Sequence, residues 1–196
     1  MKVILVGNVD VGKSSFFVRF KENRFVEQLN STIGLDQATK DIRLGDGKTV
    51  KVNLWDTAGL EVQGSMTSSY YRLSKGIILM YDVKDRDSLS SLRMWINDIN
   101  PYINEHTTFF LLGNKIDSFN TEIDVNTKDA VNFARNINIP TDHVFEISVK
   151  TGDGFENFIT SVATILSCEK SPFVPDINNV NLGDNQRHPN NCCNLY

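Results

Sequence analysis

The residues with the clearest chemical potential form the segment GNVDVGKS, residues 7–14. Glycines at Gly7 and Gly12 let the backbone wrap tightly, so that successive N–H groups can point at phosphate oxygens. The Lys13 ammonium can reach terminal phosphates, and the Ser14 hydroxyl can ligate Mg²⁺. The spacing therefore predicts a phosphate-binding loop. The alternative, a glycine turn with a solvated lysine, is disfavoured by the apolar run before the segment and the helical pattern after it.

Two further segments contain candidates for metal and phosphate contacts. DTAG, residues 56–59, ends an apolar run, so that Asp56 can hold the metal through water. The Gly59 N–H can approach a γ-phosphate because no Cβ intervenes. STIG, residues 31–34, lies in a polar stretch where the Thr32 hydroxyl can reach the metal and its N–H the γ-phosphate. Taken alone, Thr32 is more simply explained as a loop threonine, and an Asp at a strand end can also cap a turn.

Base selection is predicted from GNKID, residues 113–117, and SVK, residues 148–150. The Asp117 carboxylate can accept two hydrogen bonds from the N–H edge of guanine, an edge that adenine lacks. Asn114 can bond the ring, the Lys115 stem can lie over its face, and a backbone N–H of SVK can meet the guanine carbonyl. Each segment alone is a weak signal, but their order along the chain indicates a guanine nucleotide site. The acidic residue disfavours an ATP-using P-loop kinase.

These segments need a scaffold of alternating strands and helices. Continuous apolar runs predict buried strands over residues 2–7, 76–83, 108–115 and 143–148. Two further strands flank a hairpin turn at residues 45–48. Apolar side chains at helical spacing predict helices over residues 12–23, 87–99, 128–137 and 155–166. The alternation predicts an α/β fold with a mostly parallel six-stranded sheet, helices on both faces, and ligands at the carboxyl ends of the strands.

Composition limits the class of protein. The chain has 196 residues, 40% hydrophobic and 22% charged, as in soluble globular proteins. A net charge of −4 gives no electrostatic case for nucleic acid as a partner. The odd count of three cysteines argues against a disulfide framework and favours a reducing compartment. No apolar run is as long as the roughly 18 residues that a membrane-spanning helix needs, and the N-terminal apolar run is too short for a signal peptide.

With these segments in place, the chain resembles a Ras-superfamily small GTPase, and most of all the Rab subfamily. The subfamily resemblance is carried by STIGLD, NLWDTAG, YYR at residues 70–72 and MYDV at residues 80–83. It implies a three-layer P-loop GTPase domain over residues 1–168, with Mg²⁺ as cofactor and GTP or GDP as ligand. It also implies two switch segments, residues 25–36 and 57–72, that bind effectors when GTP orders them.

The resemblance implies a set of site residues. Phe25 would pack against the guanine. The nucleotide-binding residues would be Gly7, Asn8, Val9, Asp10, Val11, Gly12, Lys13, Ser14, Ser15, Phe25, Thr32, Gly59, Asn114, Lys115, Asp117, Ser148, Val149 and Lys150. The metal ligands would be Ser14, Thr32 and Asp56. The catalytic positions would be Lys13, Thr32, Gly59 and Leu60.

The sequence departs from the family pattern at several of these places. Leu60 stands where relatives carry the glutamine that orients the attacking water, and an isobutyl group cannot hold water. Val9 adds bulk where a catalytic group would enter, and Asp10 adds negative charge near the phosphates. Val149 in place of alanine predicts a looser guanine pocket, and Gln37 in place of an aromatic residue predicts different partners. Leu60 is either an engineered substitution or natural divergence, and the other departures favour divergence.

Residues 169–196 are predicted to form a flexible tail that contains a lipidation site. Cys192 and Cys193 resemble the doubly geranylgeranylated cysteine pair of Rab proteins, whereas Asn194 fits a single-prenyl signal poorly. An unmodified tail is the alternative. Two lipids would supply the second anchoring signal that one chain lacks. Cys168 is expected to be structural.

The implied partners are a nucleotide exchange factor, a GTPase-activating protein, an escort or GDI-type chaperone, effectors and a membrane. The implied protein is a monomer on the cytoplasmic side of intracellular membranes, cycling with the cytosol. Two functional hypotheses stay open from sequence alone. One is a switch that hydrolyses GTP slowly in vesicle trafficking, and the other is a GTP-loaded recruiter of effectors that is reset by nucleotide exchange. Leu60 together with Val9 is the feature that separates them.

Overall fold

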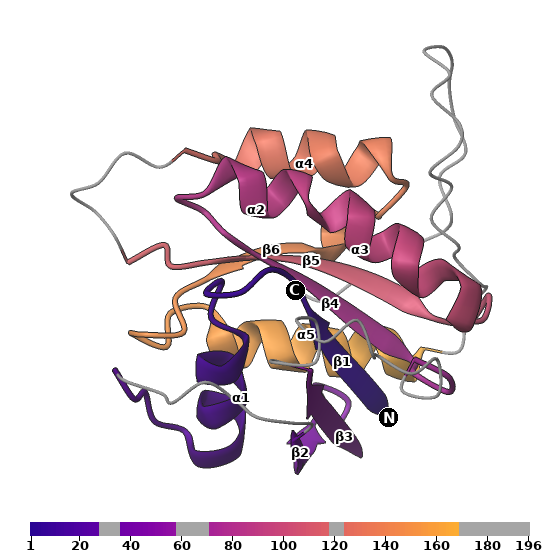
Figure 1. The fold of residues 1–196 in the computed structure, drawn as a ribbon. Helices are drawn as coiled ribbons and strands as arrows, with labels where there is room; N and C mark the ends of the chain where they lie inside the picture. Colours follow the sequence, from indigo (N-terminus) through magenta and orange to yellow (C-terminus); the bar gives the residue numbers. More distant parts are fainter. Residues whose placement is uncertain (28–35, 58–70, 118–123, 169–196) are drawn as a thin grey trace.

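The structure is a computed structural model, and it describes residues 1–27, 36–57, 71–117 and 124–168. Its middle layer is a six-stranded sheet with the strand order β2-β3-β1-β4-β5-β6 (Figure 1). The strands are β1 (Lys2–Val6), β2 (Asp36–Arg43), β3 (Thr49–Asp56), β4 (Gly76–Asp82), β5 (Thr108–Asn114) and β6 (Val144–Ile147). Only the pairing of β2 with β3 is antiparallel. The expected mostly parallel sheet with one antiparallel pair is therefore confirmed.

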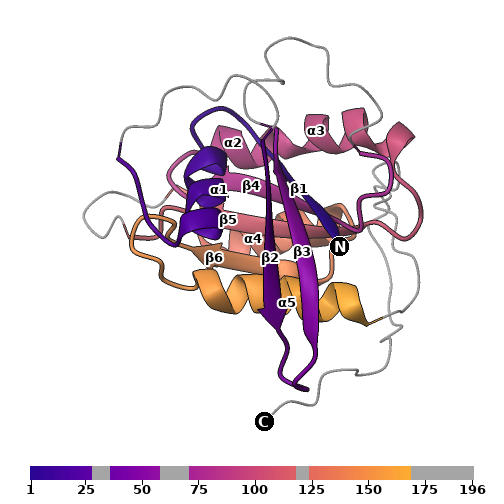
Figure 2. The same ribbon diagram turned by 90° about the horizontal axis from the view of Figure 1, so that it is seen from below.

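Helices cover both faces of this sheet. They are α1 (Lys13–Glu22), α2 (Arg86–Ser90), α3 (Leu92–Ile99), α4 (Thr127–Asn136) and α5 (Phe155–Ser167), with the short 3₁₀ helices η2 (Asn100–Tyr102) and η3 (Thr141–His143). Helices α1 and α5 lie on one face, and α2, α3 and α4 lie on the other (Figures 1 and 2). The result is the three-layer α/β arrangement that the alternation of strands and helices predicts.

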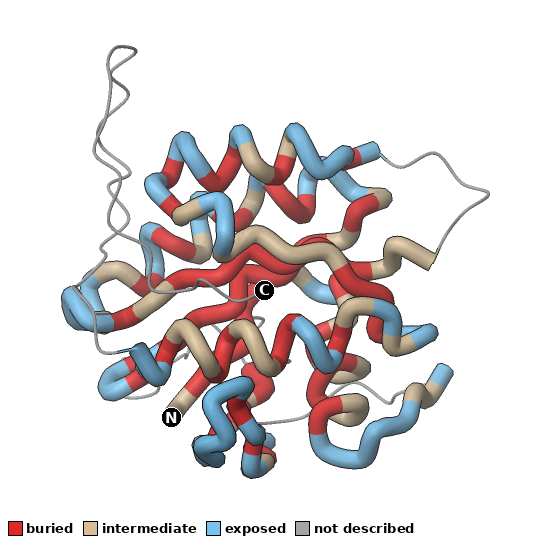
Figure 3. Tube along the Cα trace, turned by 180° about the vertical axis from the view of Figure 1, so that it is seen from behind, coloured by how far each residue is buried: buried red, intermediate tan, exposed pale blue. Residues whose placement is uncertain are grey.

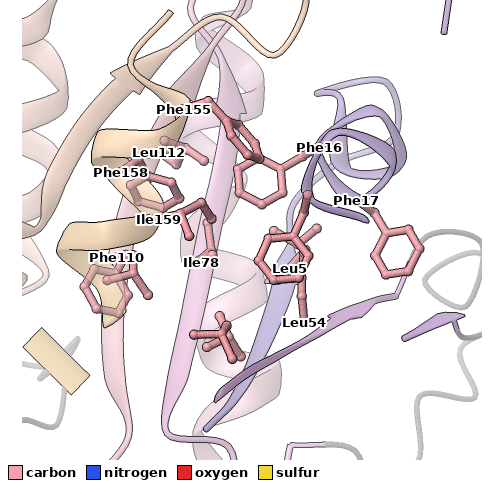
Figure 4. Packing of buried hydrophobic residues seen from close by; sticks show 14 of the residues in the cluster. Leu5, Phe16, Phe17, Leu54, Ile78, Phe110, Leu112, Phe155, Phe158 and Ile159 are labelled. Carbon is pink, nitrogen blue, oxygen red and sulfur yellow. The ribbon is translucent and has the colours of Figure 1, made fainter. Parts of the chain in front are cut away.

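Alternate residues of the central strands feed two separate hydrophobic clusters. In β1, Val3 and Leu5 join the cluster under α1 and α5, while Ile4 and Val6 join the cluster under α2, α3 and α4. The first cluster gathers Phe16 of α1 and the aromatic rings of α5 over the sheet (Figure 4). Because these strands are buried on both faces, they are continuous apolar runs (Figure 3). This rigid sheet fixes where its carboxyl-end loops stand.

The predicted hairpin turn is also present between β2 and β3. The Leu44 N–H donates to the Lys48 carbonyl at 2.7 Å, which closes the turn. Gly47 adopts φ +83°, a left-handed conformation that glycine adopts without steric cost.

The single helix predicted over residues 87–99 is wrong, because the chain forms two helices that break at Ser91. The Ser91 hydroxyl donates to the Asp87 carbonyl at 2.7 Å, and the Ser88 hydroxyl donates to the Asp85 carbonyl at 2.6 Å. Serine hydroxyls that bond nearby carbonyls offer the backbone an alternative to continuous helix. Apolar spacing does not reveal this competition.

Helix α5 is the last element that the structure describes, and Cys168 is its C-cap. Cys168 is a free, exposed cysteine, so the expectation of a structural role is wrong. Residues 169–196 lie outside the described residues, and the predicted division into residues 1–168 and a tail stays a prediction.

Candidate nucleotide-binding site

The loop between β1 and α1 has the backbone that its glycines predict. Gly7 has φ +152°, and a Cβ there would lie 2.2 Å from the Met80 carbonyl oxygen. Gly12 has φ +101°, and a Cβ there would lie 2.3 Å from Asn114 Nδ2. Both contacts are too short for any side chain, so each glycine lets a neighbouring strand approach the loop.

Lys13 is enclosed by this loop. Lys13 is only 4% exposed, and its Nζ donates to the carbonyl oxygens of Gly7 and Asn8, each at 2.7 Å. The ammonium therefore lies inside the curve of the loop, where phosphate oxygens would meet it. Ser14 follows in the first turn of α1, Ser15 beside it is half-buried, and Val11 packs into the core.

Val9 and Asp10 form the exposed tip of the loop. Val9 is 69% exposed, and Asp10 adopts φ +66° with its side chain 96% exposed. A carboxylate in open water is strongly screened, so the expected repulsion of phosphates by Asp10 stays a prediction of modest size. The Asp10 backbone carbonyl, in contrast, is fixed because it accepts from Lys115 Nζ at 2.7 Å.

Helix α3 also holds the loop, through a contact that the sequence did not indicate. Trp95 Nε1 donates to Asn8 Oδ1 at 2.9 Å. Sequence spacing placed Trp95 on an apolar helical face, and its ring does pack against the second core cluster. The indole N–H is the polar part that reaches the phosphate loop.

Asn114, at the end of β5, joins the phosphate loop to the loop after β6. Its Nδ2 donates to the Val11 carbonyl at 2.9 Å, and its Oδ1 accepts from the Val149 N–H at 3.0 Å. The side chain is buried, and both bonds connect segments far apart in sequence. Asn114 thus fixes the two predicted nucleotide-contacting loops relative to each other, and the expected ring contact stays a prediction.

Lys115 is held by the neighbouring strand. Its Nζ lies 2.8 Å from Asp82 Oδ2, at the end of β4, in addition to its bond to the Asp10 carbonyl. The ion pair and the backbone bond extend the side chain across the site, as the predicted stacking of its stem on a base requires. Asp82 belongs to the quoted MYDV segment but was not predicted as a site residue.

Asp117 and Ser148 meet at the predicted base site. Ser148 Oγ donates to Asp117 Oδ1 at 2.6 Å and accepts from the Thr151 N–H at 3.0 Å. Ser148 is fully buried, so its hydroxyl sets the orientation of the carboxylate. A carboxylate held in this way is prepared to accept further N–H donors.

Val149 does not line an open pocket. Its side chain is 1% exposed and packs in the first core cluster with Phe155 and Ile147. The prediction that Val149 loosens the guanine pocket is not supported, because the methyl groups that valine has in addition to alanine fill space in the core. Lys150 is exposed beside it.

Two of the predicted metal ligands lie at the carboxyl end of the sheet. Asp56 ends β3, is 1% exposed and pairs in register with Leu5 of β1, two residues before the phosphate loop. The next residue, Thr57, is tied to β1 because its Oγ1 donates to the Leu5 carbonyl at 2.7 Å. The other predicted ligand, Ser14, is the second residue of α1. A carboxylate and a hydroxyl are hard oxygen donors that fit Mg²⁺.

Several predicted positions cannot be placed. Thr32, Gly59, Leu60, Cys192 and Cys193 lie outside the described residues. Phe25 is described: it is half-buried and packs against the first core cluster, and its predicted guanine contact stays a prediction.

The fold and the loops at its carboxyl edge define an α/β P-loop domain of the GTPase type. A sequence model of the Ras family matches residues 2–167. Over 162 residues the chain is 40% identical to Ras-related protein Rab-1D of Dictyostelium discoideum, covering 83% of this chain and 77% of that protein. The chain belongs to the Ras family, as a small GTPase of the Rab subfamily.

Proposed function

We propose that this Rab-like GTPase is a membrane-trafficking switch that binds GTP and GDP with Mg²⁺ and hydrolyses GTP slowly. The observation that carries the proposal is the pair of hydrogen bonds that the Asn114 side chain makes, one to the Val11 carbonyl and one to the Val149 N–H. That side chain joins the predicted phosphate-binding loop, residues 7–14, to the predicted base-contacting loop, residues 148–150. The Asp117 carboxylate accepts a hydrogen bond from Ser148 of the second loop. A nucleotide with a guanine base matches both loops.

Each residue has a separate task in this proposal. The backbone of residues 7–12 and Lys13 bind the phosphates, and Asp117 selects guanine. Ser14, Thr32 and Asp56 would hold Mg²⁺, which would supply positive charge to neutralise the terminal phosphates. Thr32 and Gly59, which lie outside the described residues, would contact the γ-phosphate through their N–H groups. Catalysis then depends on positioning a water against that phosphate.

Identification of the bound nucleotide tests this function directly. Purified protein should release guanine nucleotide on denaturation, and chromatography over time should show slow conversion of bound GTP to GDP. Adenine nucleotide bound in equal amount would contradict the proposal.

Regulators and effectors of the Rab type would act on the two switch segments, with the protein as a monomer. Gln37 lies opposite Trp55 in the β2–β3 register and is exposed. An amide at this exposed site, in place of an aromatic ring, would change which effectors bind the surface beside Trp55.

Restoring the water-holding group should accelerate hydrolysis. We expect Leu60→Gln to raise the single-turnover rate of GTP hydrolysis by about tenfold or more, equal to roughly 1.4 kcal/mol of barrier. Rapid-quench measurement of preloaded protein gives this rate. Leu60→Ala is the matched control, since it removes the isobutyl group without adding an amide, and it should give no gain. Val9→Gly combined with Leu60→Gln tests whether Val9 blunts the gain.

An equal rate in the unmodified protein and in Leu60→Gln would contradict slow intrinsic hydrolysis. Another group would then hold the water.

Within the described residues, no helix is long and apolar enough to cross a membrane. We propose attachment through lipids on Cys192 and Cys193, which would place the protein on the cytoplasmic side of intracellular membranes and let a chaperone return it to the cytosol. Either Cys→Ser change should weaken membrane retention, and the double change should leave the protein soluble, because one lipid binds only marginally. Cell fractionation measures this, with Cys168→Ser as the control that should stay bound. Full retention of the double variant would contradict the two-lipid anchor.

A further inference from the structure

Arg19 of α1 is hydrogen-bonded to the loop that follows β6. Its Nε donates to the Val149 carbonyl at 2.5 Å, and its Nη2 donates to the Lys150 carbonyl at 2.9 Å. Two donors of one planar guanidinium therefore bind two consecutive carbonyls, 130 and 131 residues away in sequence. A fork of this kind fixes both the position and the orientation of its acceptors.

The loop is shaped to receive this side chain. A Cβ on Gly152 would lie 3.1 Å from Arg19 Nη1, so the absence of a side chain at Gly152 leaves room for the guanidinium. On the other side of the same loop, the Val149 N–H donates to Asn114 Oδ1. The loop is thus held from two directions, by Asn114 at an N–H and by Arg19 at the carbonyls.

One of the two bonded carbonyls belongs to a peptide group that is proposed to contact the base. The Val149 carbonyl shares its peptide unit with the Lys150 N–H, one of the backbone donors proposed for the guanine carbonyl. A hydrogen bond to the oxygen of a peptide group polarises that group and strengthens its N–H as a donor. The charge on Arg19 acts in this direction on the Lys150 N–H. The second bonded carbonyl, that of Lys150, shares its peptide unit with the Thr151 N–H, which donates to Ser148 Oγ at 3.0 Å.

Helix α1 connects this contact to the phosphate end of the site. Lys13 and Ser14 form its first turn, and Arg19 lies within the same ten-residue helix. A rigid helix that holds the phosphates at one end therefore holds the base loop further along.

We infer that Arg19 is a positioning residue that holds the guanine-contacting loop in place and slows nucleotide release. The inference rests on the proposed function, because it assumes that residues 148–150 contact the base. The Arg19 guanidinium is bound to the Val149 and Lys150 carbonyls, whereas the residues proposed to meet the phosphates, Lys13 and Ser14, lie in the first turn of α1. Loss of the guanidinium should therefore change nucleotide retention and leave the chemical step almost unchanged.

The test compares Arg19→Met, Arg19→Lys and Arg24→Met in the full chain. Arg24 follows α1 closely, is 64% exposed and pairs with Glu22, so its change controls for lost surface charge. Release of fluorescent GDP, chased with excess unlabelled GDP and Mg²⁺, gives the dissociation rate. We expect Arg19→Met to release GDP about tenfold faster, as lost charge-assisted bonds predict. Arg19→Lys should be intermediate, since an ammonium cannot reproduce the fork, and Arg24→Met should match the unmodified protein.

Single-turnover GTP hydrolysis in preloaded protein separates positioning from general damage. In Arg19→Met it should stay within about twofold of the unmodified rate, because the phosphate and water contacts are untouched. Unmodified GDP release in Arg19→Met, or hydrolysis that falls in parallel with retention, would overturn the inference. If Arg19→Met does not fold, the intermediate release rate of Arg19→Lys carries the test, and an unmodified rate there overturns it. Competition between GDP and ADP on the unmodified protein is measured first, and equal affinities would overturn the proposed function itself.

Discussion

Replacing Asp117 with Asn should lower the affinity for GDP by about a hundredfold and transfer the preference to xanthine nucleotides. The carboxylate would accept two hydrogen bonds from the guanine N–H edge, and each such bond to a charged group is worth roughly 1.5–3 kcal/mol. Loss of both at the lower value is about 3 kcal/mol, or about two decades in the dissociation constant. Xanthine carries a carbonyl where guanine carries the exocyclic amine, so the amide of the substituted residue can donate to it.

Competition binding with GDP, xanthosine diphosphate and ADP measures this change. Asp153→Asn is a matched control, because Asp153 is an exposed carboxylate near the same loop, and it should leave all three affinities unchanged. The hydroxyl of Ser148 can rotate and accept from the new amide, so the side chain keeps its place. No gain for the xanthine nucleotide would show that Asp117 does not contact the base.

The second large effect concerns stability. Gly12→Ala should lower the free energy of unfolding by about 3 kcal/mol or more. The new Cβ would have to form at φ +101° and only 2.3 Å from Asn114 Nδ2. Asn114 cannot move away without loosening its bonds to Val11 and Val149, both of which are buried.

Two glycines of the β2–β3 turn supply controls for this experiment. Gly47→Ala imposes left-handed strain at φ +83° but meets no atom within 4 Å, so it should cost only about 1 kcal/mol. Gly45→Ala meets neither strain nor contact and should be nearly neutral. Urea unfolding at several GDP concentrations measures all three and separates the contribution of nucleotide binding from that of the fold. If Gly12→Ala costs no more than Gly47→Ala, crowding against Asn114 is not what requires glycine.

The fold was predictable because its strands are buried on both faces. A run such as KVILV must be apolar throughout when Val3 and Ile4 face opposite clusters, and that pattern is visible without a structure. The break at Ser91 was not predictable in the same way. It depends on which of several serine hydroxyls bonds a backbone carbonyl, and apolar periodicity carries no information on that choice.

Some residues of the candidate site could be predicted from the sequence and others could not. Gly7, Gly12 and Lys13 were predictable because their spacing serves one local backbone shape. Trp95 and Arg19 were not, because their polar contacts join residues 87 and 130 positions apart. Such contacts depend on how helices are docked on the sheet, which spacing within a short segment does not specify.

The hydrogen bond between Trp95 and Asn8 has a consequence for the fluorescence of the protein. Trp95 and Trp55 are the two tryptophans of the chain, and indole emission responds to hydrogen bonding and to nearby charge. Trp95 is bonded to the phosphate loop, whereas Trp55 lies on β3 with the Lys2 ammonium 4.4 Å from its ring centroid. The two fluorophores therefore sample different parts of the molecule, and Trp55→Phe or Trp95→Phe leaves one of them alone. Unlabelled protein thus carries its own spectroscopic reporter of events at the phosphate loop.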